Sequence, residues 1–382
     1  SLPFPDTGQQ ENAGTPHPVH AQARFLRAWK RSGPTGVIGS FRRLARHVVE
    51  EYPGGKQRML RAVNLTQERI VLVLAVALTA AFAISLPGFL TAENLLALVR
   101  SVSVLGVLGI AMALVVIGRG IDLSLVAVMA VSLAWPLNLV THGMPHGVAL
   151  LLGMGFCLLS GIITGFLVAY VEIPAIFATL AMGTFIYGFG RYFLITLDVV
   201  YLPDAARSIV WIGSGSFLGI PVPVLIFACV CLLGALFLRY VKSGRFIRAI
   251  GDNPLAARIT GIPVRPVIVM QYALSGLIGF VAGLVTATSV ASMNIRVANS
   301  TFVYDVILVV VLGGIGLSGG KGGVRNVIVG TLLIGVLING MTIMDVQYTV
   351  QNVIKSLILL LAIVADTIIN PRDEQTAQQG DI

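Results

Sequence analysis

Between residues 70 and 370, the chain is a succession of apolar segments, each roughly as long as a membrane is thick. A helix of about 20 apolar residues crosses the ~30 Å hydrocarbon core of a bilayer. We therefore predict an all-α fold, a polytopic membrane helix bundle of about ten transmembrane helices. A broken or re-entrant helix would look similar at the short eighth segment, and also around Arg119, where the second and third segments nearly join. The predicted helices are residues 70–89, 101–118, 122–140, 148–170, 174–196, 219–240, 267–289, 302–316, 324–342 and 352–370.

Composition agrees with a membrane location. Of the 382 residues, 56% are apolar and only 11% are charged, against about 25% charged in soluble domains. The net charge of +9 does not indicate a nucleic-acid partner, because the basic residues are spread among loops and form no aromatic-rich basic groove. The expected surroundings are therefore a lipid bilayer.

The distribution of basic residues predicts the orientation. If the N-terminus lies inside, 21 of the 26 Lys and Arg residues fall at cytoplasmic positions. Cytoplasmic loops of membrane proteins carry such an excess of positive charge. We therefore predict that both termini are cytoplasmic. The five exceptions, at or near outer ends, are Arg100, Arg191, Arg207, Arg296 and Lys355.

Polar regions flank the apolar part and give three predicted domains. Residues 1–69 form a cytoplasmic N-terminal extension with eleven Lys or Arg against five Asp or Glu. Residues 70–370 form the membrane domain, and residues 371–382 form a cytoplasmic tail. Within the extension, apolar residues recur at helical spacing over about 37–53. This pattern predicts a basic amphipathic helix that lies on the inner leaflet or packs on a partner subunit.

A hydrophilic stretch at residues 242–265, between two apolar segments, predicts a small helix outside the membrane. Asn253 is a good N-cap, because its side-chain oxygen can accept an unpaired backbone N–H. Pro254 suits the first helical position, and Gly261 supplies a left-handed stop. The predicted helix covers residues 254–260.

One face of this predicted helix can dock a partner protein. Leu255 and Ile259 lie four residues apart and therefore share a face. The small residues Ala256 and Ala257 flank them, so the helix offers a shallow apolar ridge.

The hydrophilic stretch resembles the cytoplasmic coupling loop in permeases of bacterial ABC sugar importers of the ribose, xylose and furanosyl-autoinducer type. Three further motifs of that family match in order and spacing, at Gly120–Ser124, Ile173–Leu180 and Gly313–Gly323. The resemblance implies a multi-pass helical permease in the bacterial inner membrane. The chain departs from the family at Arg119, where Gly is usual, and after Asp305, where bulky residues replace an Ala-rich sequence.

The resemblance also implies three protein partners and a sugar substrate. A cytoplasmic ABC ATPase would dock on the coupling loop, residues 242–267, and a periplasmic or extracellular sugar-binding protein would deliver the sugar. A second permease copy or a homologue would complete a permease dimer. Since the partner hydrolyses ATP, the chain itself is expected to be a transport subunit and not an enzyme. The candidate coupling residues are Gly251, Asp252, Asn253, Pro254, Leu255, Ala256, Ala257, Arg258, Ile259 and Gly261.

A glycine-rich stretch satisfies the G-x-G-x-x-G string at Gly314–Gly319, but it does not predict a nucleotide site. The segment before it is membrane-like, no βαβ unit surrounds it, and no acidic residue follows about 20 residues later. Lys321 does not belong to a P-loop either, because Gly322 replaces the required Ser or Thr. We predict a tight turn for close helix packing, or a mobile element near a gate. The glycines concerned are Gly313, Gly314, Gly316, Gly319 and Gly320.

No acid–base pair, activated nucleophile or metal cluster is visible in the sequence, and no cofactor is expected. Charged residues in a membrane need a partner or water, and we expect Arg191, Lys355 and Asp366 to snorkel from helix ends. Asp122 is interpreted as a cap that organises its turn. A neutral polyol would be bound by hydroxyl and amide groups, each of which can equally serve helix packing. Candidates along a path are Asp122, Ser124, Thr179, Ser289, Asn294, Asp305 and Asn339.

We predict the permease subunit of an ABC importer for a monosaccharide or related small polyol. A branched-chain amino-acid permease of the same superfamily is the first alternative, disfavoured by Gly120–Ser124 and by the full Gly-Asp-Asn-Pro loop. An ion-coupled secondary transporter, from a different class, would show buried carboxylates in mid-helix, and these are scarce. A membrane anchor would not need the docking loop.

Overall fold

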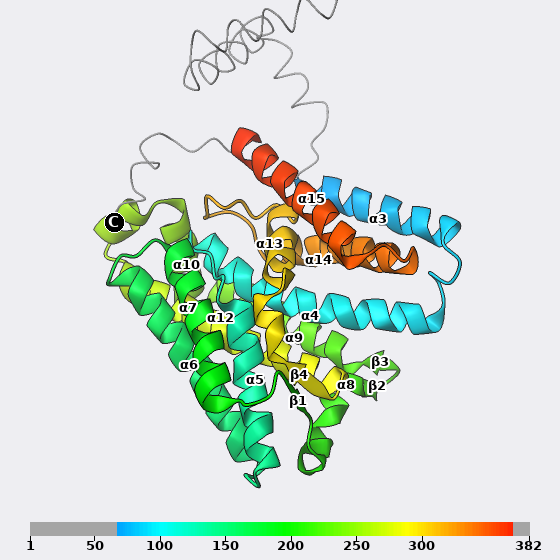
Figure 1. The fold of residues 1–382 in the computed structure, drawn as a ribbon. Helices are drawn as coiled ribbons and strands as arrows, with labels where there is room; N and C mark the ends of the chain where they lie inside the picture. Colours follow the sequence, from blue (N-terminus) through cyan, green and yellow to red (C-terminus); the bar gives the residue numbers. More distant parts are fainter. Residues whose placement is uncertain (1–66, 370–382) are drawn as a thin grey trace, which may run out of the picture. The chain divides into compact units, whose positions relative to one another are not determined.

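The structure, a computed structural model, describes residues 67–369 (Figure 1). Contacts divide the chain after Leu65, and all described residues belong to the second unit, Thr66–Ile382. The predicted amphipathic helix at about 37–53 and the tail at 371–382 lie outside the described residues.

Each predicted apolar segment corresponds to a helix. The apolar helices are α3 (Gln67–Ser85), α4 (Ala92–Ile117), α5 (Leu125–Thr141), α6 (His146–Ala169), α7 (Ala175–Phe189), α9 (Val222–Tyr240), α12 (Val264–Ser289), α13 (Phe302–Leu312), α14 (Val324–Ile343) and α15 (Tyr348–Ile369). A π-helical turn, η1 (Gly190–Leu194), continues α7.

Within the described part of the chain, six helices are long and apolar enough to cross a membrane, namely α3, α4, α6, α9, α12 and α14. Shorter apolar helices are Leu125–Thr141, Phe302–Leu312 and Tyr348–Val364. The chain is therefore a helical, multi-pass membrane protein. The number of ten spans and the side on which the termini lie stay predictions.

Helix α4 lies at the centre of the packing. Nearly every residue from Val102 to Ile117 is buried, as expected for a helix that is apolar on all its faces. It packs against α9, α12, α13 and α14. Helix α12 also packs closely on α6, because Gly161 and Gly165 of α6 face the backbone of Tyr272 and Val269 without room for a Cβ atom.

Short elements join the apolar helices at both ends. Helices α10 (Lys242–Asp252) and α11 (Pro254–Ile259) lie between α9 and α12. The remaining pieces are β1 (Val199–Tyr201), η2 (Asp204–Val210), α8 (Trp211–Ser214), β2 (Ser216–Phe217), β3 (Ile220–Pro221), β4 (Ser292–Asn294) and η3 (Ile295–Asn299).

The strands were not predicted. Strands β1 and β4 pair antiparallel, with Val200 opposite Met293, and β2 pairs with β3 in a hairpin. These two- and three-residue strands carry no period-2 pattern long enough to read from sequence. They correct the all-α prediction only locally, since the described part of the chain is otherwise helical.

Candidate functional site

Helix α11 has the local geometry predicted for it. Asn253 Oδ1 accepts a hydrogen bond from the backbone N–H of Ala256 at 3.0 Å, and Pro254 occupies the first turn. The helix spans Pro254–Ile259, and Gly261 follows it with φ at +83°, in the left-handed region. The predicted cap, helix and stop are confirmed.

The exposed side of α11 carries two large apolar side chains. Leu255 is 43% exposed and Ile259 is 86% exposed, whereas Ala257 is 4% exposed and belongs to the protein's own core. The expectation that Ala257 flanks an exposed ridge is therefore wrong. Residues two apart lie on nearly opposite faces of a helix, so exposure of Leu255 and Ile259 turns Ala257 inward. The docking role of the ridge stays a prediction.

Helix α10 holds α11 against the bundle, and the sequence analysis missed it. Its inner face consists of Gly244, Ile247, Ile250 and Gly251, all buried, and it packs on α9 and α12. The signal was present in the spacing of these residues, which recur three and four apart. The basic residues Lys242 and Arg245 mark the opposite, polar face.

The end of α10 meets the end of α4. Arg119 Nε donates to the carbonyl oxygen of Gly251 at 2.7 Å, and Arg119 Nη2 donates to that of Asp252 at 3.0 Å. The backbone N–H of Gly320 donates to Ile117 O at 2.8 Å. The end of the coupling helices and the glycine stretch, far apart in sequence, thus meet at the end of α4, directly before the Gly120–Ser124 motif.

The glycine stretch forms the tight turn that was predicted. Gly314, Gly319 and Gly320 have φ between +77° and +94°, where only glycine is unstrained. A Cβ atom on Gly320 would overlap Asp252 Oδ1, and one on Gly313 would overlap Asn326 O. Close packing is therefore what these glycines provide, and a gating role stays a prediction.

Asp122 organises the turn between α4 and α5, although not as a helix cap. Its Oδ1 accepts from Ser124 N at 3.1 Å and from Ser124 Oγ at 2.6 Å. Its Oδ2 accepts from Ser275 Oγ of α12 at 2.7 Å. The carboxylate is only 3% exposed and is satisfied by these donors, so it fixes the turn and joins it to α12.

The other path candidates are spread over separate elements, and each has a local partner. Thr179 Oγ1 donates to Ala175 O within α7 at 2.8 Å. Asn294 Oδ1 accepts from the backbone N–H of Arg296 at 3.0 Å.

Two candidates make contacts between elements. Ser289 Oγ donates to Gly213 O at 3.2 Å as well as to Val285 O of its own helix. Asn339 of α14 and Asn94 of α4 exchange hydrogen bonds at 2.8 and 3.1 Å. The translocation role of all these residues stays a prediction.

Asp305 has a partner that was not foreseen. Lys355 Nζ of α15 lies 2.8 Å from Asp305 Oδ1 of α13, and both side chains are less than 10% exposed. The snorkelling expected of Lys355 is therefore wrong, because this ammonium group turns inward to a carboxylate. Together with Thr301, Tyr304 and Asn352, the pair lines a cavity of ≈ 10 Å³ between the two helices.

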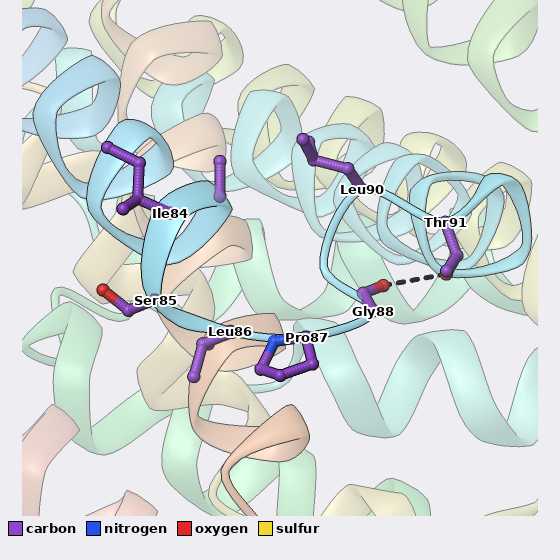
Figure 2. A pocket seen from close by; sticks show the side chains of 8 residues that line it. Ile84, Ser85, Leu86, Pro87, Gly88, Leu90 and Thr91 are labelled. Carbon is purple, nitrogen blue, oxygen red and sulfur yellow. Dashed lines mark hydrogen bonds between the residues drawn. The ribbon is translucent and has the colours of Figure 1, made fainter.

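The N-terminal end of α4, opposite the Arg119 contacts, borders a hollow without charged side chains. An open hollow at the turn between α3 and α4 is lined by the residues from Ala83 to Thr91 other than the buried Phe89, and none of these lining side chains is titratable. Thr91 Oγ1 donates a hydrogen bond to Gly88 O there at 2.8 Å (Figure 2). With a rise of 1.5 Å per residue, the 26 residues of α4 place it about 39 Å from the Arg119 contacts.

Metal-ligating side chains do not cluster in the described part of the chain. Within residues 67–369, no group of three His, Cys, Asp or Glu side chains could hold a metal ion. Asp122 and Asp305 are each engaged by hydroxyl or ammonium donors.

Comparisons with known proteins identify permeases as the relatives of this chain. Residues 94–364 match the family model described as branched-chain amino acid transport system / permease component. The ribose import permease protein of Escherichia coli (strain K12) is 31% identical, over 82% of this chain and 97% of that protein. The galactofuranose transporter permease protein of Escherichia coli (strain K12) is 33% identical, over 68% and 75%. The xylose transport system permease protein of Haemophilus influenzae is 29% identical, over 81% and 98%. No solved structure gives a significant match.

Proposed function

The chain belongs to the branched-chain amino acid transport system permease family, and we propose that it is the permease subunit of an ABC importer for a monosaccharide or related polyol. The observation that carries the proposal is α11, a capped helix that holds Leu255 and Ile259 outside the bundle. In the proposal, a cytoplasmic ATPase receives these two side chains in an apolar groove. A binding protein delivers the sugar on the opposite side of the membrane from the ATPase.

Relatives support the substrate class. The permeases similar to this chain are named for ribose, galactofuranose and xylose. Branched-chain amino acids are named only in the description of the family model. The substrate is therefore proposed to be a sugar, translocated across the bacterial inner membrane by a pair of permeases.

The contacts of the buried carboxylates disfavour ion-coupled transport. Such a transporter is expected to show a carboxylate that can bind and release a proton or cation in mid-membrane. Asp122 accepts three hydrogen bonds from serine residues, and Asp305 is neutralised by Lys355. Neither carboxylate is open to an ion in this structure.

The docking role is tested with Ile259→Glu. Ile259 is 86% exposed, so the substitution leaves the bundle folded while placing a charge in the proposed contact, where an unpaired buried charge is costly. The variant is expected to reach the membrane in normal amount, to lose co-purification of the ATPase and to lose uptake of labelled sugar. Leu218→Glu, at a side chain that is 88% exposed in the turn between β2 and β3, is the matched control and should retain ATPase co-purification.

Two results would reject the proposal. Normal ATPase association and uptake in Ile259→Glu would show that α11 is not the docking helix. Uptake of labelled leucine, but of no ribose, xylose or galactofuranose, by the intact complex would show that the substrate is an amino acid.

A further inference from the structure

The turn after α4 holds a non-glycine residue in an unusual conformation. Arg119 has φ at +69°, a region that side-chain-bearing residues rarely occupy. Such a conformation persists only where surrounding contacts hold it, and it is a reason to look for function. At Arg119 those contacts come from the coupling loop.

The Arg119 side chain binds the joint between α10 and α11. Its guanidinium group donates to Gly251 O and Asp252 O, the last carbonyls of α10, at 2.7 and 3.0 Å. The next residue, Asn253, caps α11. A guanidinium group presents its donors as a rigid fork, and a cation is favoured at a helix C-terminus. The side chain therefore fixes both the position and the direction of the joint.

The backbone around this contact leaves little freedom to slide. A Cβ atom on Gly251 would overlap Ile117 O, and one on Gly319 would overlap the Arg119 side chain. Gly320 N donates to Ile117 O at 2.8 Å. A displacement of the α10–α11 joint would therefore push directly on the last turn of α4, the helix at the centre of the bundle.

We propose that Arg119 is a positioning residue for transport, which ties the α10–α11 joint to α4 so that movement of α11 reaches the centre of the bundle. The inference rests on the proposed docking of an ATPase on α11. In this inference, Arg119 couples ATP hydrolysis to translocation. Assembly of the complex is a separate step and depends on Leu255 and Ile259.

The test replaces the side chain without disturbing the turn. Glycine, which is usual at this position in the family that the chain resembles, adopts positive φ freely. Arg119→Gly therefore removes the guanidinium fork without straining the turn, and it tests a link that is particular to this chain. Arg119→Lys keeps a cation but offers a point charge in place of the fork. Lys321→Ala, which removes an exposed basic side chain near the same turn, is the control. Each is purified with its ATPase and binding protein, reconstituted in vesicles, and assayed for ATPase bound and for sugar accumulated per ATP hydrolysed.

Arg119→Gly is expected to bind the ATPase like the wild type and to hydrolyse ATP, but to accumulate at least about tenfold less sugar per ATP, as two charge-assisted hydrogen bonds are lost. Arg119→Lys should be intermediate, and Lys321→Ala unchanged. An unaltered ratio of sugar to ATP in Arg119→Gly would overturn the inference. So would loss of ATPase binding, because Arg119 would then serve assembly.

Failure of this inference is distinguishable from failure of the proposed function. If Ile259→Glu loses the ATPase while Arg119→Gly couples normally, the docking helix is right and the role of Arg119 is wrong. If Ile259→Glu still assembles and transports, the docking helix itself is wrong, and the role of Arg119 falls with it.

Discussion

The buried pair of Asp305 and Lys355 makes a quantitative prediction about α15. Helix α15 packs chiefly on α13, and the pair lies within that contact at 2.8 Å with both side chains less than 10% exposed. Tyr348 and Asn352 of α15 add hydrogen bonds to Thr301 at 2.9 and 3.1 Å. The attachment of α15 is therefore unusually polar for two apolar helices.

Removing one partner should be far worse than removing both. Lys355→Met leaves the Asp305 carboxylate buried without its cation, and Asp305→Leu does the same to the ammonium group. Breaking a buried pair in this way costs about 3–5 kcal/mol, whereas apolar replacement of both partners is often neutral or stabilising. The double variant is therefore expected to be more stable than either single one.

The measurement is a double-mutant cycle on the purified protein in mild detergent. Unfolding is driven by SDS and followed by tryptophan fluorescence. Arg207→Met, which breaks the exposed Asp204–Arg207 pair at 3.9 Å, is the control and should cause no measurable change. If the costs of the two single variants add in the double variant within about 0.5 kcal/mol, the pair is not coupled and the reasoning fails.

Three shorter predictions concern the coupling loop and its supports. Asn253→Ala removes the acceptor for Ala256 N, so it should cost about 0.5–2 kcal/mol of helix stability and weaken, without abolishing, ATPase co-purification; Asn253→Asp should restore it. Gly251→Ala should lower the melting temperature in detergent because its methyl group would overlap Ile117 O, whereas Gly155→Ala, with open space around the Cβ position, should not. Asp122→Asn and Ser275→Ala should each destabilise the protein, and their double variant should be less destabilised than the sum, because both act on one hydrogen bond.

The apolar segments predicted the helices because each carries its signal within itself, and the boundaries were less reliable. Helix α4 was expected from residue 101, but it begins at Ala92 with a cap from Thr91. Glu93, Asn94 and Arg100 interrupt the apolar run there. Thr91 and Glu93 carry a helix-start signal, an N-cap residue and an acidic residue in the first turn, but an apolar count does not register it, because polar residues shorten the apolar run.

Features that depend on distant segments could not be predicted. Asp305 and Lys355 are 50 residues apart, and neither residue's surroundings in the sequence point to the other. The inward turn of Ala257 likewise depends on how α10 seats α11 against the bundle. Spacing shows which residues share a helix face, but packing decides which face is buried.

The stiffness of the contacts around Ile117 indicates where movement can be absorbed. Helix α4 is buried along most of its length and is fastened at its far end by Asn94 and Asn339, so it can move only as a body. The turn that follows it is fixed to α12 by Asp122. The glycine turn is attached to the same place, because Gly320 N donates to Ile117 O and Gly319 and Gly320 pack closely on Arg119 and Asp252. Its glycines Gly314, Gly319, Gly320 and Gly322 all have positive φ. We therefore expect displacement of α11 to shift α4 and the attached Gly313–Gly323 turn together, with the change in backbone direction taken up at the glycines, because glycine changes φ and ψ at lower cost than other residues.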